Sequence, residues 1–426
     1  MATPSSPARE PQRLSDLSPQ QWRSGIAAWL GWLFDGLEMH LYTLVAAPLV
    51  VTLLGATSTA DPAVKEKSAY IQAAFLVGWA LGGAFFGRVG DRIGRSRALA
   101  LTVLTYALCT GLCGLAQTWW QLMLFRFVAA LGIGGEWAVG ATLLAETWPR
   151  SWRPWMAAVL QTAVNLGILL AAAVVGLLSM LPTPPSERTV FFVGVIPALM
   201  VFWIRKKVPE SEGWQRAEAT AHPKVVLADL FRGGLARVTL HTMTVCALSL
   251  SGWWLFIFWH AQHLRMLLAA EGASGAVVTQ RVSAAFFAVV LVSIAGNFFA
   301  GLLARRFGYP KAISAMLAAL GLAMVGAFCV ERSVSDLVWF WFPLVGFFSG
   351  VFSLFTMYLP PLFPTLLRTT GAGFCYNIGR LAAAAASLVF GWYAPVGDFR
   401  QALLLSSVLA LAAAFLAVFL PRAREE

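Results

Sequence analysis

The chain has 426 residues, of which 59% are hydrophobic and 12% are charged, and its formal net charge is +11. This composition is too apolar for a surface that faces water, and it indicates a polytopic α-helical protein with the lipid bilayer as its solvent. The basic residues lie in breaks between apolar stretches, where they orient a membrane protein, so we expect no nucleic-acid partner.

The first twenty residues are polar and contain several prolines. They include no apolar run and no small-residue cleavage site, so we expect an N-terminal tail, 1–23, rather than a removable signal peptide. The first apolar stretch then acts as an uncleaved insertion signal.

Apolar stretches of about the length of a membrane-crossing helix follow one another between charged breaks. The predicted spans are 24–52, 69–88, 98–117, 120–145, 155–179, 190–206, 238–262, 277–304, 311–330, 336–359, 369–393 and 399–420. We therefore predict an all-α fold with twelve transmembrane helices.

The longest polar segment divides these spans into two sets of six. We expect an N-terminal bundle at 24–206, a linker at 207–237, a C-terminal bundle at 238–420 and a short tail at 421–426. With the N-terminus in the cytoplasm, most arginines and lysines fall on the inner side. The positive-inside rule thus predicts a multi-pass plasma (inner) membrane protein with both termini and the linker in the cytoplasm.

The two halves resemble each other in sequence. Residues 87–94, which follow span two, align with residues 301–308, which follow span eight, and nearly the same offset places Pro149 and Arg153 on Pro364 and Arg368. Duplicated halves around a central site are an expected construction of transporters. The second copy departs from the first at Arg305, where an exact repeat would have Asp.

Two charged residues of the N-terminal half lie deep in predicted spans. Asp35 lies about 12 residues past Arg23, roughly 18 Å into a core of about 30 Å, and Arg126 reaches nearly the same depth from the opposite face. We predict that Asp35 and Arg126 approach each other. An acid whose proton affinity depends on its distance from a cation is suited to proton coupling, and the alternative is a static structural pair.

Two more acids are candidate proton-coupling groups. Glu38 lies one turn beyond Asp35 on the same face, and Glu136 lies past the midpoint of span four. The glycines at 132, 134 and 135 allow another helix to approach Glu136 closely.

The second half carries a midplane cation, Arg380, preceded by Tyr376 and Asn377. A substrate carboxylate could neutralise it through a bidentate contact, and the alternative is an acid or backbone carbonyls of a neighbouring helix. Gln161 and Asn165 share one face of span five, where they bind solute hydroxyls or hold helices together. We expect these five residues to bind substrate.

The turn after span two is too short to shape a pocket, and its charged residues are well placed to pair with helix ends. It contains Gly87, Asp91, Arg92, Gly94 and Arg95, and we expect it to pair with helix ends and with Glu146, Arg153 and its repeat equivalent Arg368. The alternative is a plain basic anchor on the inner side.

The segment Gly87 to Arg95 reads G-x-x-x-D-R-x-G-R and resembles the signature loop of the major facilitator superfamily. Further motifs are similar to those of the sialate and lactate proton-symporter branch: Gln21 to Arg23, Ala28 to Gly36, Gly132 to Trp137, Glu146 to Pro149, Pro209 to Trp214, Phe363 to Thr365 and Gly371 to Arg380. Pro361 departs from this pattern, because many relatives carry Glu there. The resemblance implies proton-coupled symport of a small organic anion, either a monocarboxylate or a sialate-like acid. It also implies that the turn after span two, with Glu146, Arg153 and Arg368, is a latch that joins the halves on the cytoplasmic side.

The expected function is therefore secondary active transport by alternating access, by a monomer whose partners are an organic anion, protons and lipid, with no metal or cofactor. A carrier of neutral solutes such as sugars is the alternative within transport, and two midplane arginines favour an anion over it. A membrane sensor would need a signalling domain. An enzyme is not expected, because the intramembrane Cys, His and Asp residues lack nucleophile–base or metal-ligand spacing.

Overall fold

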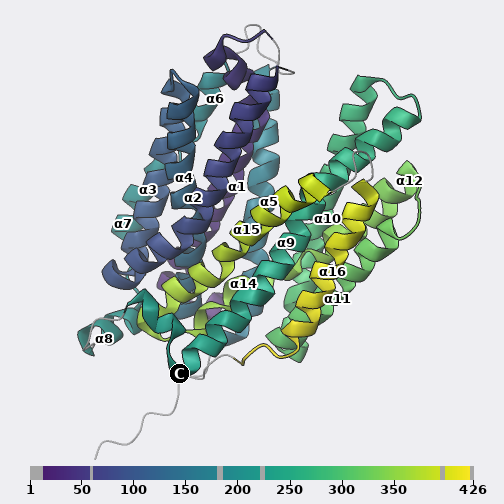
Figure 1. Cartoon of the computed structure of the whole chain (residues 1–426). Coiled ribbons are helices and arrows are strands. Elements are labelled where there is room, and N and C mark those ends of the chain that lie inside the picture. Colours follow the sequence, from purple (N-terminus) through teal and green to yellow (C-terminus); the bar gives the residue numbers. More distant parts are fainter. Residues whose placement is uncertain (1–12, 58–60, 180–185, 221–225, 394–398, 423–426) are drawn as a thin grey trace, which may run out of the picture.

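The computed structural model describes residues 13–57, 61–179, 186–220, 226–393 and 399–422, and helices are the regular elements of this part of the chain (Figure 1). This confirms the predicted all-α fold. Residues 1–12 of the predicted N-terminal tail and 423–426 of the C-terminal tail lie outside the described residues.

Helices of the first half coincide with the first six predicted spans. They are α1 (Pro19–Leu54), α2 (Pro62–Ile93), α3 (Arg95–Leu115), α4 (Trp119–Thr147), α5 (Arg153–Ser179) and the consecutive pair α6 (Glu187–Val193) and α7 (Ala198–Lys207). The linker contains the short helix α8 (Glu212–Thr220) and a 3-10 turn, η3 (Leu227–Phe231).

Helices of the second half coincide with the other six spans. They are α9 (Gly233–Ala270), α10 (Gly275–Phe307), α11 (Tyr309–Phe328), the series α12 (Val334–Asp336), η4 (Leu337–Trp341), α13 (Phe342–Phe348) and α14 (Val351–Tyr358), then α15 (Arg368–Tyr393) and α16 (Phe399–Ala417). By length and composition, ten helices of the described residues qualify as membrane spans, and α1 and α15 correspond to the remaining two predictions.

The helices form two bundles, α1 to α7 and α9 to α16, which meet at one end and diverge toward the other (Figure 1). The end where they meet carries the start of α1 and the end of α16, and we call it the termini end. Two 3-10 turns, η2 (Arg150–Trp152) and η6 (Thr365–Leu367), also lie there, each just before α5 or α15.

Glycines allow α2 and α15 to touch across the two bundles. A Cβ atom on Gly83 would lie 2.7 Å from the Gly373 carbonyl oxygen, and one on Gly373 would lie 2.3 Å from the Gly83 carbonyl oxygen. Such distances leave no room for a side chain, so the backbones pack directly, as small residues permit in membrane helix pairs. This contact joins the two bundles on the termini side of the cavity that is described next.

Candidate functional site

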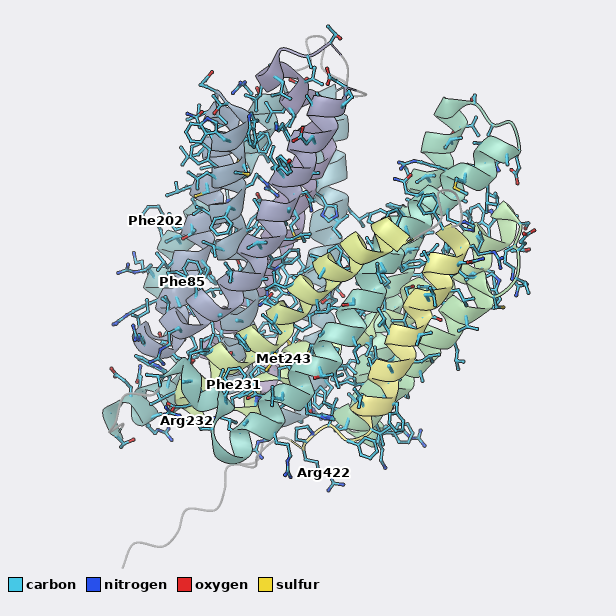
Figure 2. The ribbon with its side chains drawn as sticks, viewed as in Figure 1. Phe85, Phe202, Phe231, Arg232, Met243 and Arg422 are labelled. Carbon is cyan, nitrogen blue, oxygen red and sulfur yellow. The ribbon has the colours of Figure 1, made fainter. Side chains whose placement is uncertain are left out.

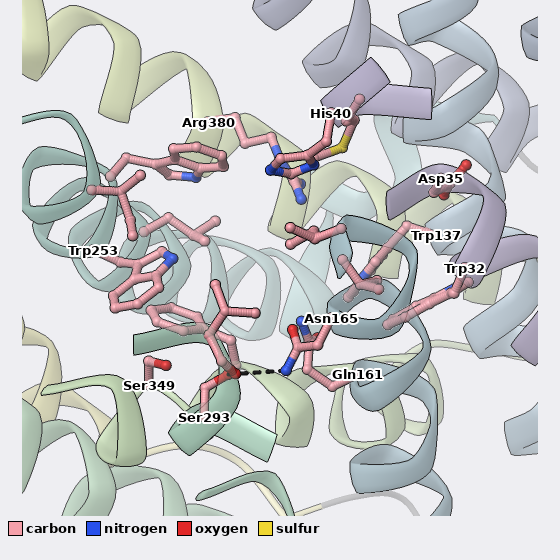
Figure 3. Close-up of a pocket in the computed structure, with 18 of the residues that line it drawn as sticks. Trp32, Asp35, His40, Trp137, Gln161, Asn165, Trp253, Ser293, Ser349 and Arg380 are labelled. Atoms are coloured by element: carbon pink, nitrogen blue, oxygen red, sulfur yellow. Dashed lines mark hydrogen bonds between the residues drawn. The ribbon is translucent and has the colours of Figure 1, made fainter. Parts of the chain in front are cut away.

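A cavity of about 190 Å³ lies between the two bundles and is lined by residues of both (Figure 3). Its walls are mainly aromatic and aliphatic side chains, which is typical of a small-molecule site. The polar side chains that line it are Asp35, His40, Gln161, Asn165, Ser293, Asn297, Ser349 and Arg380. Four of the five predicted substrate-binding residues therefore share one cavity: Arg380, Tyr376, Gln161 and Asn165.

Arg380 is held in the wall by aromatic rings. Its guanidinium carbon lies 3.9 Å from the centroid of Trp79 and 5.0 Å from that of Tyr376. Tyr376 in turn stacks on Trp137, with ring centroids 4.1 Å apart and an interplanar angle of 2°. Cation–π contacts of this kind hold a guanidinium in place without neutralising its charge.

Asn377 does not line the cavity, but it is hydrogen-bonded to Arg380. Its Oδ1 accepts a hydrogen bond from Arg380 Nη1, and its Nδ2 donates to the Gly373 carbonyl at 3.0 Å. Within the described residues, no carboxylate lies within 4 Å of Arg380, and its Nε has no hydrogen-bond partner. The guanidinium is thus positioned by neutral groups and retains the capacity to bind an anion.

Asp35 and Glu136 form a pair of buried acids next to the cavity. Asp35 lines the cavity and is 6% exposed, whereas Glu136 lies behind it and is fully buried. Gly31 makes room for Glu136, because a Cβ there would lie 1.6 Å from Glu136 Oε1. Asp35 follows Gly31 by one helical turn, and its carboxyl group interacts with that of Glu136.

Within the described residues, neither oxygen of Glu136 accepts a well-aligned hydrogen bond, and Asp35 Oδ1 accepts none either. Two ionised carboxylates cannot donate to each other, so a proton on one of them would supply the missing donor. This arrangement is suited to holding a proton close to a bound solute.

Arg126 pairs with Glu38 and not with Asp35, which corrects the pairing expected from depth. Arg126 Nη1 donates to Glu38 Oε1, and Thr110 Oγ1 donates to the same oxygen at 2.6 Å. Glu38 lies three residues, or about 4.5 Å, farther along α1 than Asp35, and this difference is smaller than the error of a depth estimate. Arg126 also lies 4.2 Å above the ring of Tyr42, outside the cavity.

The predicted latch residues gather at the termini end. Arg95 contacts Asp91 at 3.2 Å and Glu146 at 2.9 Å within its own half. It crosses to the other half through Nη2, which donates to the Thr365 carbonyl at 2.6 Å. Arg368 reaches back from the second half to Glu146 at 3.2 Å.

Asp91 caps the first turn of α15 in the opposite half. It accepts hydrogen bonds from the backbone N–H of Thr369 at 3.2 Å and of Thr370 at 2.8 Å, and from the Thr370 hydroxyl at 2.5 Å. An acid at a helix N-terminus is favoured by the helix dipole. Gly87 permits the approach, since a Cβ there would lie 2.9 Å from the Thr369 carbonyl oxygen.

The other three predicted latch residues, Gly94, Arg153 and Arg92, lie in different environments. Gly94 has a φ of 102° and lies against Glu210, whose Oε1 accepts from the Arg95 backbone N–H at 2.6 Å. Arg153 lines a small cavity with Glu146 and Arg368. Arg92 is exposed and lies outside the network of Asp91 and Arg95.

Sequence reasoning missed His40, Ser293, Asn297 and Ser349 in the cavity and Glu210, Thr369 and Thr370 in the latch. Asn297 is an amide in a long apolar span, a signal that could have identified it. Glu210 falls within the motif Pro209 to Trp214, but neither it nor Thr369 and Thr370 stands out locally, because polar residues are common in loops and at helix ends.

Comparisons with known proteins agree with this architecture. A family model described as sugar (and other) transporter matches residues 42–243. A probable 4-methylmuconolactone transporter from Cupriavidus pinatubonensis is 31% identical over 377 residues, which are 88% of this chain and 84% of that protein. A sialic acid transporter from Escherichia coli is 27% identical, with 88% of this chain and 87% of that protein covered.

A solved structure of a major facilitator superfamily proton:xylose symporter, bound to 6-bromo-6-deoxy-D-glucose, has a TM-score of 0.73 and 17% identity. The match covers 94% of this chain and 96% of the symporter chain. At this identity the likeness concerns the fold, and it confirms the predicted arrangement of two six-helix halves.

Proposed function

From the premise that this chain belongs to the major facilitator superfamily, and is a membrane transporter rather than an enzyme, we propose that it is a proton-coupled symporter of a small organic anion. Two of its relatives carry organic acids. Arg380 is the observation that carries the proposal: it is a buried cation in the wall of a cavity that both halves share. A carboxylate can bind its planar fork through two parallel hydrogen bonds.

The size of the cavity supports a compact acid. A volume of about 190 Å³ is slightly larger than that of an engineered cavity of about 150 Å³ that binds benzene. Aromatic walls around Arg380 offer stacking surfaces for a flat ring. We therefore favour a carboxylate with about one six-membered ring, and we place the larger sialate-like acids second.

Proton coupling is assigned to Asp35 and Glu136. Asp35 reaches the cavity, so its protonation state would change the potential at a solute bound to Arg380. Glu136 interacts with it from behind and is sealed from water. The paired charges of Glu38 and Arg126 neutralise each other beside these acids, and we assign them the task of holding α1 against α4.

The described conformation has the latch closed at the termini end and the bundles apart at the other end (Figure 1). We assign the termini end to the cytoplasm of a cell with this chain in its inner membrane, because the basic residues favour that side. The cavity then faces outward, ready for uptake. A monomer suffices for alternating access, since both halves belong to one chain.

Uptake into proteoliposomes tests the proposed function. Labelled benzoate should accumulate when an inward proton gradient is imposed and should only equilibrate when the gradient is collapsed. Xylose is the matched neutral solute, because a sugar carrier is the second candidate. Gradient-driven uptake of xylose without uptake of benzoate would replace the organic anion by a sugar.

A further inference from the structure

The cavity has a second polar region that the anion site does not use. Asn165 of α5 and Ser293 of α10 lie well apart from Arg380, with apolar side chains between them (Figure 3). Asn165 Nδ2 donates to Ser293 Oγ at 2.9 Å, and Ser293 Oγ donates to the Val290 carbonyl at 2.7 Å. This hydrogen-bonded pair connects the two halves at the wall of the cavity.

Asn297 lies one helical turn beyond Ser293 and lines the same cavity. Its side chain is 1% exposed, and within the described residues its Nδ2 has no hydrogen-bond partner. A buried donor without an acceptor costs free energy, so such a group in a binding cavity indicates a missing ligand atom. The missing atom is an oxygen that accepts a hydrogen bond.

The backbone at Asn297 has little freedom to move. A Cβ on Gly296 would lie 1.8 Å from the Phe347 carbonyl oxygen, and one on Gly350 would lie 2.6 Å from the backbone nitrogen of Asn297. Helix α10 therefore packs directly on the junction of α13 and α14. An amide on such a fixed backbone loses little conformational freedom when it binds a ligand, and this favours ligand recognition by Asn297.

We propose that Asn297, with the Asn165–Ser293 pair beside it, forms a second subsite that binds a hydroxyl or carbonyl oxygen of the substrate. This inference rests on the proposed function, because Arg380 binds the carboxylate of the same molecule. The substrate class is accordingly a ring-sized carboxylic acid with an oxygen substituent on the side of the ring remote from its carboxylate. An unsubstituted ring acid binds to Arg380 and the aromatic walls alone.

Affinity measurements on the purified full chain test the subsite, with benzoate, 3-hydroxybenzoate and 4-hydroxybenzoate as probes. We expect at least one hydroxylated acid to bind roughly three- to tenfold more tightly than benzoate, as one neutral hydrogen bond allows. Asn297→Leu should remove this preference, so that the variant binds the hydroxylated acids no more tightly than it binds benzoate. Asn297→Ala serves the same purpose if the leucine variant does not fold.

Thr356→Val is the matched control. Thr356 is fully buried, its hydroxyl donates to the Ser353 carbonyl at 2.7 Å, and it does not line the cavity. This variant should keep the preference. Melting temperatures without ligand separate the two roles, because Asn297→Leu removes an unsatisfied donor and should not lower stability, whereas Thr356→Val removes a satisfied hydroxyl.

Equal affinity of the wild-type protein for all three acids would overturn the subsite and leave carboxylate binding intact. A preference that persists in both Asn297 variants would also overturn it. Failure of benzoate and both hydroxylated acids to bind would instead reject the organic anion itself, and the subsite with it.

Discussion

Arg380 and Asp35 reach one cavity from different halves of the chain, and each is held by neighbours of a different kind. Arg380 lies among aromatic rings and the amide of Asn377, which leave its charge available. Asp35 lies beside a second acid, Glu136, so the pair can exchange a proton. In the proposed function, anion binding at Arg380 is therefore separate from proton binding at Asp35 and Glu136.

Arg380→Gln should weaken benzoate binding by roughly ten- to a hundredfold, because a charge-assisted hydrogen bond contributes about 1.5–3 kcal/mol. Arg380→Lys should restore binding only in part, since an ammonium lacks the planar fork. Titration calorimetry and melting temperature on the same purified variants provide the measurement. Unchanged affinity with lost stability would mean that Arg380 holds helices together and that the anion binds elsewhere.

Asp35→Asn should abolish gradient-driven accumulation and spare exchange of solute across the membrane, because the amide keeps the shape but cannot bind and release a proton. Uptake with and without an imposed pH gradient measures both activities. Asn165→Ala is a control in the same cavity that carries no charge, and it should still respond to the gradient. Full accumulation by Asp35→Asn would exclude Asp35 from coupling.

Helix α1 has a glycine, Gly31, at the point where the carboxyl group of Glu136 from α4 packs against it. The distance of 1.6 Å between a Cβ at Gly31 and Glu136 Oε1 leaves no space even for a methyl group. Gly83 and Gly373 likewise leave out a side chain between α2 and α15, so that the backbones of the two halves meet there. Glycines thus permit close helix contacts both beside the buried acids and between the two halves.

Gly31→Ala should destabilise the protein by about 1–3 kcal/mol, the usual effect of overpacking, and should displace the Glu136 side chain. Gly234→Ala is the matched control, because Gly234 lies at the start of α9 and a Cβ added there would have no described atom within 4 Å. That change should be neutral or slightly stabilising. Thermal denaturation of both variants tests the expectation, and equal melting temperatures would show that Glu136 moves aside at no cost.

At the scale of the whole molecule, several hydrogen bonds cross between the halves at the termini end and hold the described conformation closed there. Asp91 accepts three hydrogen bonds from Thr369 and Thr370, and Arg95 and Arg368 each join a group of the opposite half. These bonds must break when the termini end opens. We therefore expect the latch to set how often each side of the membrane has access to the cavity.

Asp91→Asn should shift the population toward the conformation that is open at the termini end, because the neutral amide binds the first turn of α15 more weakly. A cysteine placed at Gln161 in the cavity, in a background without the five native cysteines, should react faster from the termini side in this variant. Arg92→Gln is the control, since Arg92 is exposed outside the network. Equal rates in both would show that Asp91 is not part of a latch.

Orientation in the membrane is a separate whole-molecule prediction. Ala219→Cys in α8 and Ala270→Cys at the end of α9 lie on exposed positions at opposite ends of the bundle (Figure 2 shows the same view with side chains). With the termini end in the cytoplasm, an impermeant thiol reagent should label only Ala270→Cys in intact cells. The background must lack Cys329, which is exposed and would itself react. Labelling of Ala219→Cys from outside would reverse the assignment.

Hydropathy and charge alone were sufficient to locate the twelve spans, because a helix must bury its backbone polar groups in hydrocarbon wherever it crosses the bilayer. They also identified Asp35, Glu136 and Arg380, since an ionisable residue in such a span is rare enough to be noticed. Which of these groups meet was decided by tertiary structure. Depth predicted Arg126 beside Asp35, whereas the rotation and approach of α1 and α4 place Arg126 on Glu38 and Glu136 next to Asp35. The contacts of Asp91 with α15 and of Asn165 with Ser293 likewise depend on how the two halves pack, and no local pattern in the sequence encodes a contact between residues some 280 or 130 positions apart.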